Sequence, residues 1–223
     1  MRALAILGFA ALAASAPAGT LTGTVAARGP AGAEAAASDG AYASHRYRLA
    51  ERVDYDHLAD FVVSIDQAVD DPSAPPPPDL TVTQRNVSFE PHVLPIVVGT
   101  TVRWPNKDTI FHNVFSMSDA KPFDLGMYTK EKVPELKFDQ VGRVDVYCSI
   151  HSQMHCIILV LPSPFFALSD AHNRYTIRGL PAGTYWVKAW QERVPSRRIR
   201  VTVPAEGEVR QDFMLGLNDL PKY

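Results

Sequence analysis

Four side chains with metal-binding atoms recur at short intervals in this sequence. Cys148, His151 and Met154 follow one another three residues apart, and His112 lies upstream in the apolar segment Phe-His-Asn-Val-Phe, residues 111–115. A thiolate, two imidazoles and a thioether are the donor set that suits an electron-transfer copper ion, with the thioether as the weak axial ligand. The sequence therefore predicts one copper ion bound by these four residues.

Each donor also has a simpler interpretation. A lone methionine usually packs in a core, and the two cysteines of the chain, Cys148 and Cys156, could form a disulfide that would use up the thiolate. If Cys148 binds the metal instead, Cys156 becomes a small apolar residue at the start of a strand. His155 could compete with Met154 for the axial position. Because neighbouring strand residues face opposite sides, we expect Met154 to point inward and His155 outward.

The elements that must position these residues are predicted to be short strands. Runs rich in β-branched and aromatic residues recur along the chain, separated by turn signals such as Pro105-Asn-Lys-Asp108 and Leu180-Pro-Ala-Gly183. Many short strands at this spacing are typical of β-sandwiches, so the predicted class is all-β. A loop between two adjacent antiparallel strands would carry the three downstream donors. His112 is expected on the opposite sheet.

Two proline-rich segments divide the chain. The linker at residues 71–78 precedes a strand-rich block of residues 79–161, and Pro162-Ser-Pro164 marks its end. All four donors fall inside this block. Residues 163–217 contain further strands but no candidate ligands.

The block resembles the cupredoxins, or blue copper proteins. The resemblance rests on residues 99–108, on His112-Asn113 and on residues 144–154, and the ligand spacing is similar to the short loop of amicyanin. It implies a type 1 copper site on a Greek-key β-sandwich. It also implies that Asn113 ties the two ligand-bearing segments together by hydrogen bonds. Four apolar residues would then shield the metal, although they could equally be plain core: Phe111, Phe115, Tyr147 and Ile150.

The C-terminal part carries a second resemblance. Residues 168–190 are similar to the second half of a carboxypeptidase regulatory-like, transthyretin-type sandwich. The usual first half is missing after residue 161, but matching segments occur near the N-terminus at Leu21–Val25 and Phe61–Ile65. We therefore predict that the copper domain is inserted into a split sandwich built from residues 20–70 and 163–217. The alternative is an irregular N-terminal extension followed by an independent C-terminal domain.

The N-terminus and the composition bear on location. Met1-Arg2, an apolar run and small residues around position 16 read as a signal peptide over residues 1–18, and the run is shorter than the roughly 20 residues of a spanning helix. The alternative is an uncleaved membrane anchor. With 46% hydrophobic residues and a net charge of −2, the chain is globular and not basic enough to bind nucleic acid. We expect a periplasmic protein without a membrane span.

The expected function follows from the copper ligands. Three strong ligands and an axial thioether leave no open position for a substrate, so we expect a one-electron carrier cycling between Cu(I) and Cu(II), and not an enzyme. A redox partner protein is implied, for which a c-type cytochrome or a dehydrogenase is the candidate. The alternatives are copper handling without electron transfer and a structural protein that binds no metal. Four histidines outside the ligand pattern are expected to be surface or hydrogen-bonded residues: His45, His57, His92 and His172.

Overall fold

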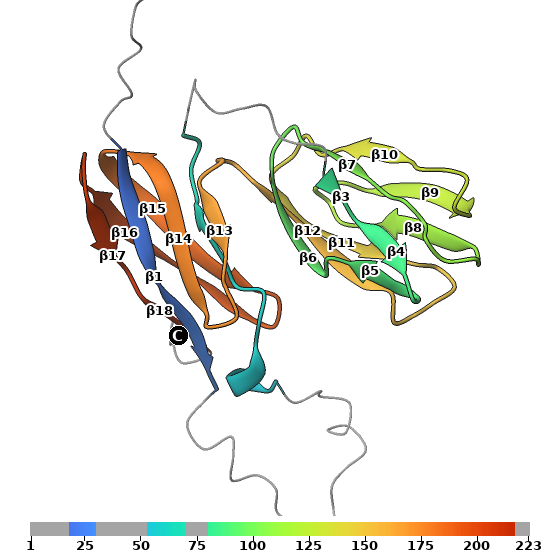
Figure 1. The fold of residues 1–223 in the computed structure, drawn as a ribbon, viewed down its shortest axis with the longest axis horizontal. Coiled ribbons are helices and arrows are strands. Elements are labelled where there is room, and N and C mark those ends of the chain that lie inside the picture. The colour runs from blue at the N-terminus through green and yellow to red at the C-terminus, as the bar shows by residue number, and fades with distance from the viewer. Residues whose placement is uncertain (1–17, 30–52, 70–79, 217–223) are drawn as a thin grey trace, which may run out of the picture.

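Strands make up nearly all of the structure, a computed structural model that describes residues 18–29, 53–69 and 80–216. In these ranges the one helical element is the 3-10 turn η3 (Tyr55–His57), and no helix has the length and apolar character to cross a bilayer. The predicted all-β class is confirmed, and two sandwiches lie beside each other in Figure 1. The predicted signal peptide, residues 1–18, lies outside the described residues except for Ala18, which begins β1. The linker 71–78 lies wholly outside them.

The central sandwich, residues 80–161, is built on a five-stranded sheet. Its strands in spatial order are β6 (Val93–Val97), β12 (His155–Leu161), β11 (Gly142–Tyr147), β8 (His112–Ser116) and β9 (Phe123–Tyr128). A three-stranded sheet and a hairpin complete it: β10 (Glu135–Lys137), β7 (Thr101–Arg103) and β3 (Leu80–Thr81), with β4 (Thr83–Arg85) and β5 (Ser88–Glu90). Fully buried apolar side chains such as Trp104, Phe138 and Ile158 form its core.

The strand that carries His112 corrects one expectation. The sequence placed His112 on the sheet opposite the Cys148 loop, but β8 belongs to the same sheet and pairs directly with β11, with Phe115 opposite Tyr147. Because the two strands are antiparallel, the loop that follows Tyr147 begins beside Val114 and continues toward His112. Adjacent strands of one sheet therefore bring the donors together.

β12 is buried on both faces, which explains its unbroken apolar run. Its inner face belongs to the core of the central sandwich and carries Cys156, Ile158 and Val160. Its outer face belongs to a separate apolar cluster that joins the two sandwiches and contains Val62, Val93, Ile157, Leu159, Leu161 and Trp190. The central sandwich therefore has an apolar interface as well as a core.

The flanking sandwich combines segments from both ends of the described chain. One of its sheets contains β14 (Arg174–Pro181), β1 (Ala18–Arg28) and β17 (Glu208–Arg210), and β18 (Phe213–Gly216) also pairs with β1. The other contains β13 (Phe166–Leu168), β2 (Val62–Ile65), β15 (Gly183–Gln191) and β16 (Val194–Val203). In each sheet the N-terminal strand, β1 or β2, lies between C-terminal strands. The transthyretin-type family and the domain limits stay predictions.

Candidate metal centre

The loop between β11 and β12 is short and closed by its own backbone. β11 ends at Tyr147, β12 begins at His155, and these two residues are opposite each other in the ladder. The Cys148 N–H donates to the Met154 carbonyl at 3.3 Å, and the Met154 N–H donates to the His151 carbonyl at 3.0 Å. These bonds hold the intervening residues in a tight turn above β8.

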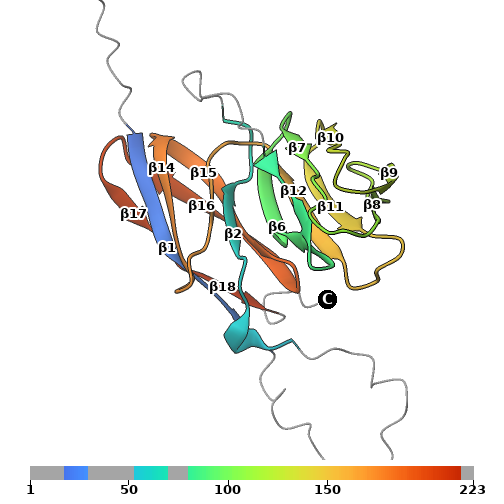
Figure 2. The same cartoon turned by 45° about the vertical axis from the view of Figure 1, so that its right-hand side comes forward.

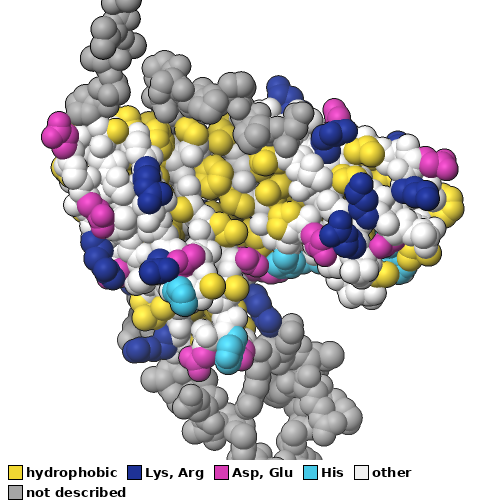
Figure 3. Space-filling model, in the orientation of Figure 1, with side chains coloured by type: hydrophobic (Ala, Val, Ile, Leu, Met, Phe, Trp, Pro, Cys, Tyr) yellow, Lys and Arg dark blue, Asp and Glu magenta, His cyan; other side chains and the backbone are white. Residues whose placement is uncertain are grey.

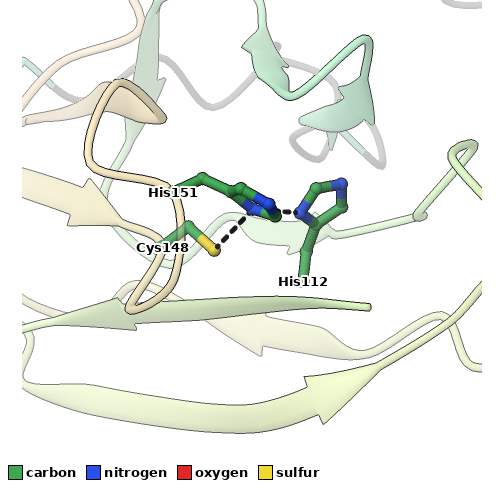
Figure 4. A group of neighbouring side chains, drawn as sticks. All are labelled: His112, Cys148 and His151. Carbon is green, nitrogen blue, oxygen red and sulfur yellow. Dashed lines mark hydrogen bonds between the residues drawn. The ribbon is translucent and has the colours of Figure 1, made fainter. Parts of the chain in front are cut away.

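Three of the predicted donors converge at this turn. The Nδ1 atoms of His112 and His151 are 3.1 Å apart, and the Cys148 Sγ lies 3.7 Å from the His151 Nδ1. Figure 4 shows both rings and the thiol directed toward one another. His112 is fully buried, Cys148 nearly so, and His151 is half-buried. The three ligating atoms lie within 4.8 Å of one another, a separation that one metal ion can bridge.

Asp108 determines which ring nitrogen of His112 has a lone pair available for a metal ion. The His112 Nε2 lies 2.8 Å from the Asp108 Oδ2. Burial raises the pKa of Asp108, but the N–H groups of Asn86 and Val87 and the His112 ring together outweigh burial and hold that pKa below its usual range. An ionised carboxylate only accepts, so the His112 Nε2 carries the proton and its Nδ1 presents a lone pair to the other donors. Sequence reasoning did not single out Asp108.

The Cys148 sulfur also has a partner on β8. The backbone N–H of Asn113 donates to the Cys148 Sγ at 3.5 Å, so a hydrogen bond does join the two ligand-bearing segments. The side chain of Asn113 is used elsewhere, because its amide donates to the Asp124 Oδ1 at 2.7 Å. The tie between the segments thus comes from the backbone of β8, a feature that residue types do not reveal.

Met154 and His155 lie on opposite faces of the loop end. Met154 is fully buried in the core that also contains Cys148, whereas the His155 ring is partly exposed and bonds to Asp145 outside that core. This agrees with the expected inward Met154 and outward His155. Cys148 and Cys156 are both free thiols, so the alternative of a disulfide between them does not occur in the structure.

The apolar residues expected around the metal are arranged differently. Tyr147 is 40% exposed and stacks on His155, and Phe115 packs against Tyr147 from the neighbouring strand. Phe111 and Ile150 are also exposed. Alternation along β11 explains the difference, because an inward Cys148 requires an outward Tyr147. The side chains buried with the donors are instead core residues, and they include Val82, Trp104, Val114, Tyr128 and Val146.

The donor set fits copper better than other common metals. Thiolate and thioether sulfurs favour Cu(I), imidazole suits both oxidation states, and a trigonal His₂Cys site with a weak axial Met is typical of electron-transfer copper. A partner on the second nitrogen of a ligand histidine is a regular feature of metal sites, and Asp108 provides it for His112. The residues present can therefore hold the predicted ion.

Comparisons with known proteins place copper proteins among the solved structures similar to this chain. A reduced single-residue mutant of amicyanin is 26% identical, with a TM-score of 0.35, over 37% of this chain and 81% of its own. A purple cupredoxin from Nitrosopumilus maritimus is 26% identical, with a TM-score of 0.33, over 37% of this chain and 99% of its own.

A copper-containing nitrite reductase from Thermus scotoductus is 30% identical, with a TM-score of 0.36, over 42% of this chain and 25% of its own. Each of these three matches covers less than half of this chain. A search of protein-family models and a search of curated proteins both find no match to the chain.

Proposed function

We propose that this protein is a one-electron carrier whose type 1 copper ion is bound by His112, Cys148, His151 and Met154. The observation that carries the proposal is the convergence of the first three donors, with 3.1 Å between the two Nδ1 atoms and 3.7 Å between Cys148 Sγ and His151 Nδ1. Two chain segments that are far apart in sequence supply them. Such convergence of an imidazole pair on a thiol is the arrangement that a trigonal copper site needs.

The surroundings of the donors suit electron transfer because they restrain movement. Asp108 fixes the His112 ring, the Asn113 N–H fixes the Cys148 sulfur, and the backbone of the loop is closed by two hydrogen bonds. Ligands held in this way keep nearly the same positions in Cu(I) and Cu(II), so little rearrangement accompanies each transfer. With Met154 as the fourth ligand, no coordination position would stay open for a substrate.

His151 is the proposed route for the electron. Of the three converging donors it is the most exposed, while His112 and Cys148 are buried. Exposed apolar side chains adjoin the ligands in sequence, namely Ile110 and Phe111 beside His112 and Ile150 beside His151. A redox partner could contact this rim, and the polar residues Ser152 and Gln153 would border the contact. A periplasmic c-type cytochrome or dehydrogenase is the class of partner that we propose.

Copper loading of the wild-type protein and of Cys148→Ser tests the proposal. We expect the wild type to show an intense thiolate-to-copper absorption band, a type 1 spin-resonance spectrum and a reversible potential, and Cys148→Ser to lose all three. Cys156→Ser is the matched control, because Cys156 is a buried free thiol in the same core and should leave the spectrum intact. A variant at Cys148 that kept the wild-type spectrum would contradict the ligand assignment, and a colourless, tightly held Cu(I) would point to copper handling.

We also propose that the flanking sandwich is a carboxypeptidase regulatory-like domain that carries the copper domain as an insertion. The placement of β1 and β2 between strands from the C-terminal part supports the insertion, and the apolar cluster around Ile157 and Trp190 attaches the two sandwiches to each other.

A further inference from the structure

A second group of metal-binding side chains lies where the two sandwiches meet. His92 precedes β6, His155 begins β12, and Glu192 follows β15 in the turn that leads to β16. β6 and β12 are neighbours in the central sandwich, and the end of the β15–β16 hairpin approaches them from the flanking sandwich (Figures 1 and 2). In Figure 3, histidine and acidic side chains gather at the waist between the two lobes. The group is therefore contributed by both sandwiches.

The Glu192 carboxylate faces one nitrogen of each ring. The His92 Nε2 lies 2.7 Å from the Glu192 Oε2, and the His155 Nδ1 lies 3.6 Å from the Glu192 Oε1. One ligating atom from each of the three residues lies within 4.8 Å of the others. All three side chains are partly exposed, so an ion from solution can reach them.

The other nitrogen of each ring already has an acceptor. The His92 Nδ1 lies 3.2 Å from the backbone carbonyl of His155, and the His155 Nε2 lies 3.1 Å from the Asp145 Oδ1. Because a carbonyl and a carboxylate accept hydrogen bonds, these two nitrogens can keep their protons while the His92 Nε2 and the His155 Nδ1 bind a metal ion. In the structure the His92 Nε2 donates to the Glu192 Oε2 at 2.7 Å, so a bound ion would replace that proton.

The surrounding charges favour such a cation. Arg143 bonds to Asp145 at 2.6 Å and lies 3.9 Å from Glu192, so one positive charge stands beside two carboxylates. Arg143, Asp145 and Glu192 together carry one net negative charge. The bond from His155 to Asp145 also reproduces the carboxylate–histidine–metal arrangement that is usual for zinc ligands.

We propose that His92, His155 and Glu192 bind a divalent ion of the zinc type, with Asp145 orienting His155. Two imidazoles and a carboxylate are a common zinc ligand set, and water would complete the four-coordinate sphere. Because Glu192 belongs to the flanking sandwich and both histidines to the central one, the ion links the two sandwiches across their apolar interface. This site is distinct from the cluster of His112, Cys148 and His151.

Titration of metal-free, full-length protein with Zn²⁺ tests the proposal. The cluster of His112, Cys148 and His151 can also bind zinc, so we expect the wild type to bind two equivalents. Cys148→Ser should lose the equivalent at that cluster. Glu192→Gln and His92→Gln should each lose the equivalent at the site between the sandwiches. We expect Asp145→Asn to bind this zinc about 10- to 100-fold more weakly, as is typical when the partner of a ligand histidine is removed. Glu131→Gln, at an exposed turn, is the control for loss of one carboxylate.

Thermal unfolding supplies a second measurement. Because an ion that binds the folded state stabilises it, Zn²⁺ should raise the unfolding temperature of Cys148→Ser but not of Cys148→Ser combined with Glu192→Gln. Circular dichroism without metal shows whether each variant is folded. The proposal is overturned if folded Glu192→Gln and His92→Gln bind as many equivalents as the wild type with the same affinity, or if Cys148→Ser binds no zinc.

Discussion

Asp108 shows how much the candidate metal site depends on a residue that is not a proposed ligand. It lies four residues before His112, at the end of the turn Pro105-Asn-Lys-Asp, and the N–H groups of Asn86 and Val87 hold its carboxylate in place. The carboxylate in turn fixes the proton of His112 on Nε2. The correct lone pair therefore faces Cys148 and His151 before any metal binds.

Substitution of this carboxylate should weaken copper binding. Asp108→Asn keeps the size of the side chain but can donate to the His112 Nε2, which favours the wrong tautomer. We expect a loss of about 10- to 100-fold in copper affinity, measured by competition with a chelator. Asp119→Asn, at an exposed turn, is the matched control for the lost charge. Equal affinities in Asp108→Asn and the wild type would show that His112 is oriented by something else.

The sequence predicted that His112, Cys148 and His151 lie together, and the structure brings these three residues together, but the orientation of their side chains could not be predicted fully. Cysteine, histidine and methionine have few alternative chemical roles at three-residue intervals, so Cys148, His151 and Met154 stand out. Asp108 was missed because a carboxylate in a turn is common, and its link to His112 depends on backbone groups of another loop. Tyr147 was expected to shield the metal or to lie in the core, but it is 40% exposed, as alternation along the strand requires beside an inward Cys148.

Among the connecting elements, the turn between β13 and β14 depends on a single carboxylate. The Asp170 Oδ1 accepts the N–H groups of His172 at 2.8 Å and Arg174 at 2.9 Å, and the Oδ2 accepts the Arg174 guanidinium. These hydrogen bonds lower the pKa of Asp170 from 3.8 to about 2, and the bond from the backbone N–H of Arg174 has the largest effect. The turn is thus stabilised by the charged form of Asp170.

The lowered pKa gives the stability of this turn a defined pH dependence. A carboxyl group with a lower pKa in the folded state contributes its full stability above the unfolded value of 3.8 and loses it as the pH falls toward about 2. We expect Asp170→Asn to unfold at a lower temperature than the wild type at neutral pH. The two unfolding temperatures should converge between pH 3.8 and about 2. A difference that stayed constant down to pH 2 would mean that the charge of Asp170 does not stabilise the turn.

Strand existence was easier to predict from sequence than strand neighbours. β-branched runs and turn signals indicated the sandwich class, because each depends on local residue types. The placement of His112 on the opposite sheet was wrong, since sheet membership depends on which strands pair, and β8 pairs with β11. The sequence did not predict that β12 is buried on both faces, because the cover on its outer face comes from the flanking sandwich.

At the scale of the whole molecule, the N-terminal strands are part of the flanking sandwich and not an appendage to it. The Gln211 N–H donates to the Thr22 carbonyl at 2.8 Å, and a Cβ at Gly23 would lie 1.9 Å from the Gln211 carbonyl oxygen. Only glycine permits such a close approach between β1 and the segment before β18. Leu21 and Ile65, from β1 and β2, are fully buried in the core of this sandwich.

This arrangement predicts that the C-terminal part cannot fold alone. Residues 163–223 expressed by themselves would lack the strand between β14 and β17 and the strand between β13 and β15. They would also lack the fully buried side chains that β1 and β2 contribute to the core. We expect this fragment to show no cooperative unfolding transition by circular dichroism and to be digested rapidly by protease.

The matched control joins residues 18–69 through a short flexible linker to residues 163–216, leaving out the central sandwich. The junction is feasible because the Ile65 N–H donates to the Phe165 carbonyl at 2.9 Å, so the two cut ends lie close together. We expect this joined chain to unfold cooperatively, since it restores both central strands, while remaining less soluble because Val62 and Trp190 lose their apolar cover. Cooperative folding of residues 163–223 alone would instead show that the flanking sandwich is not split, and that the N-terminal strands only add to a domain that is already complete.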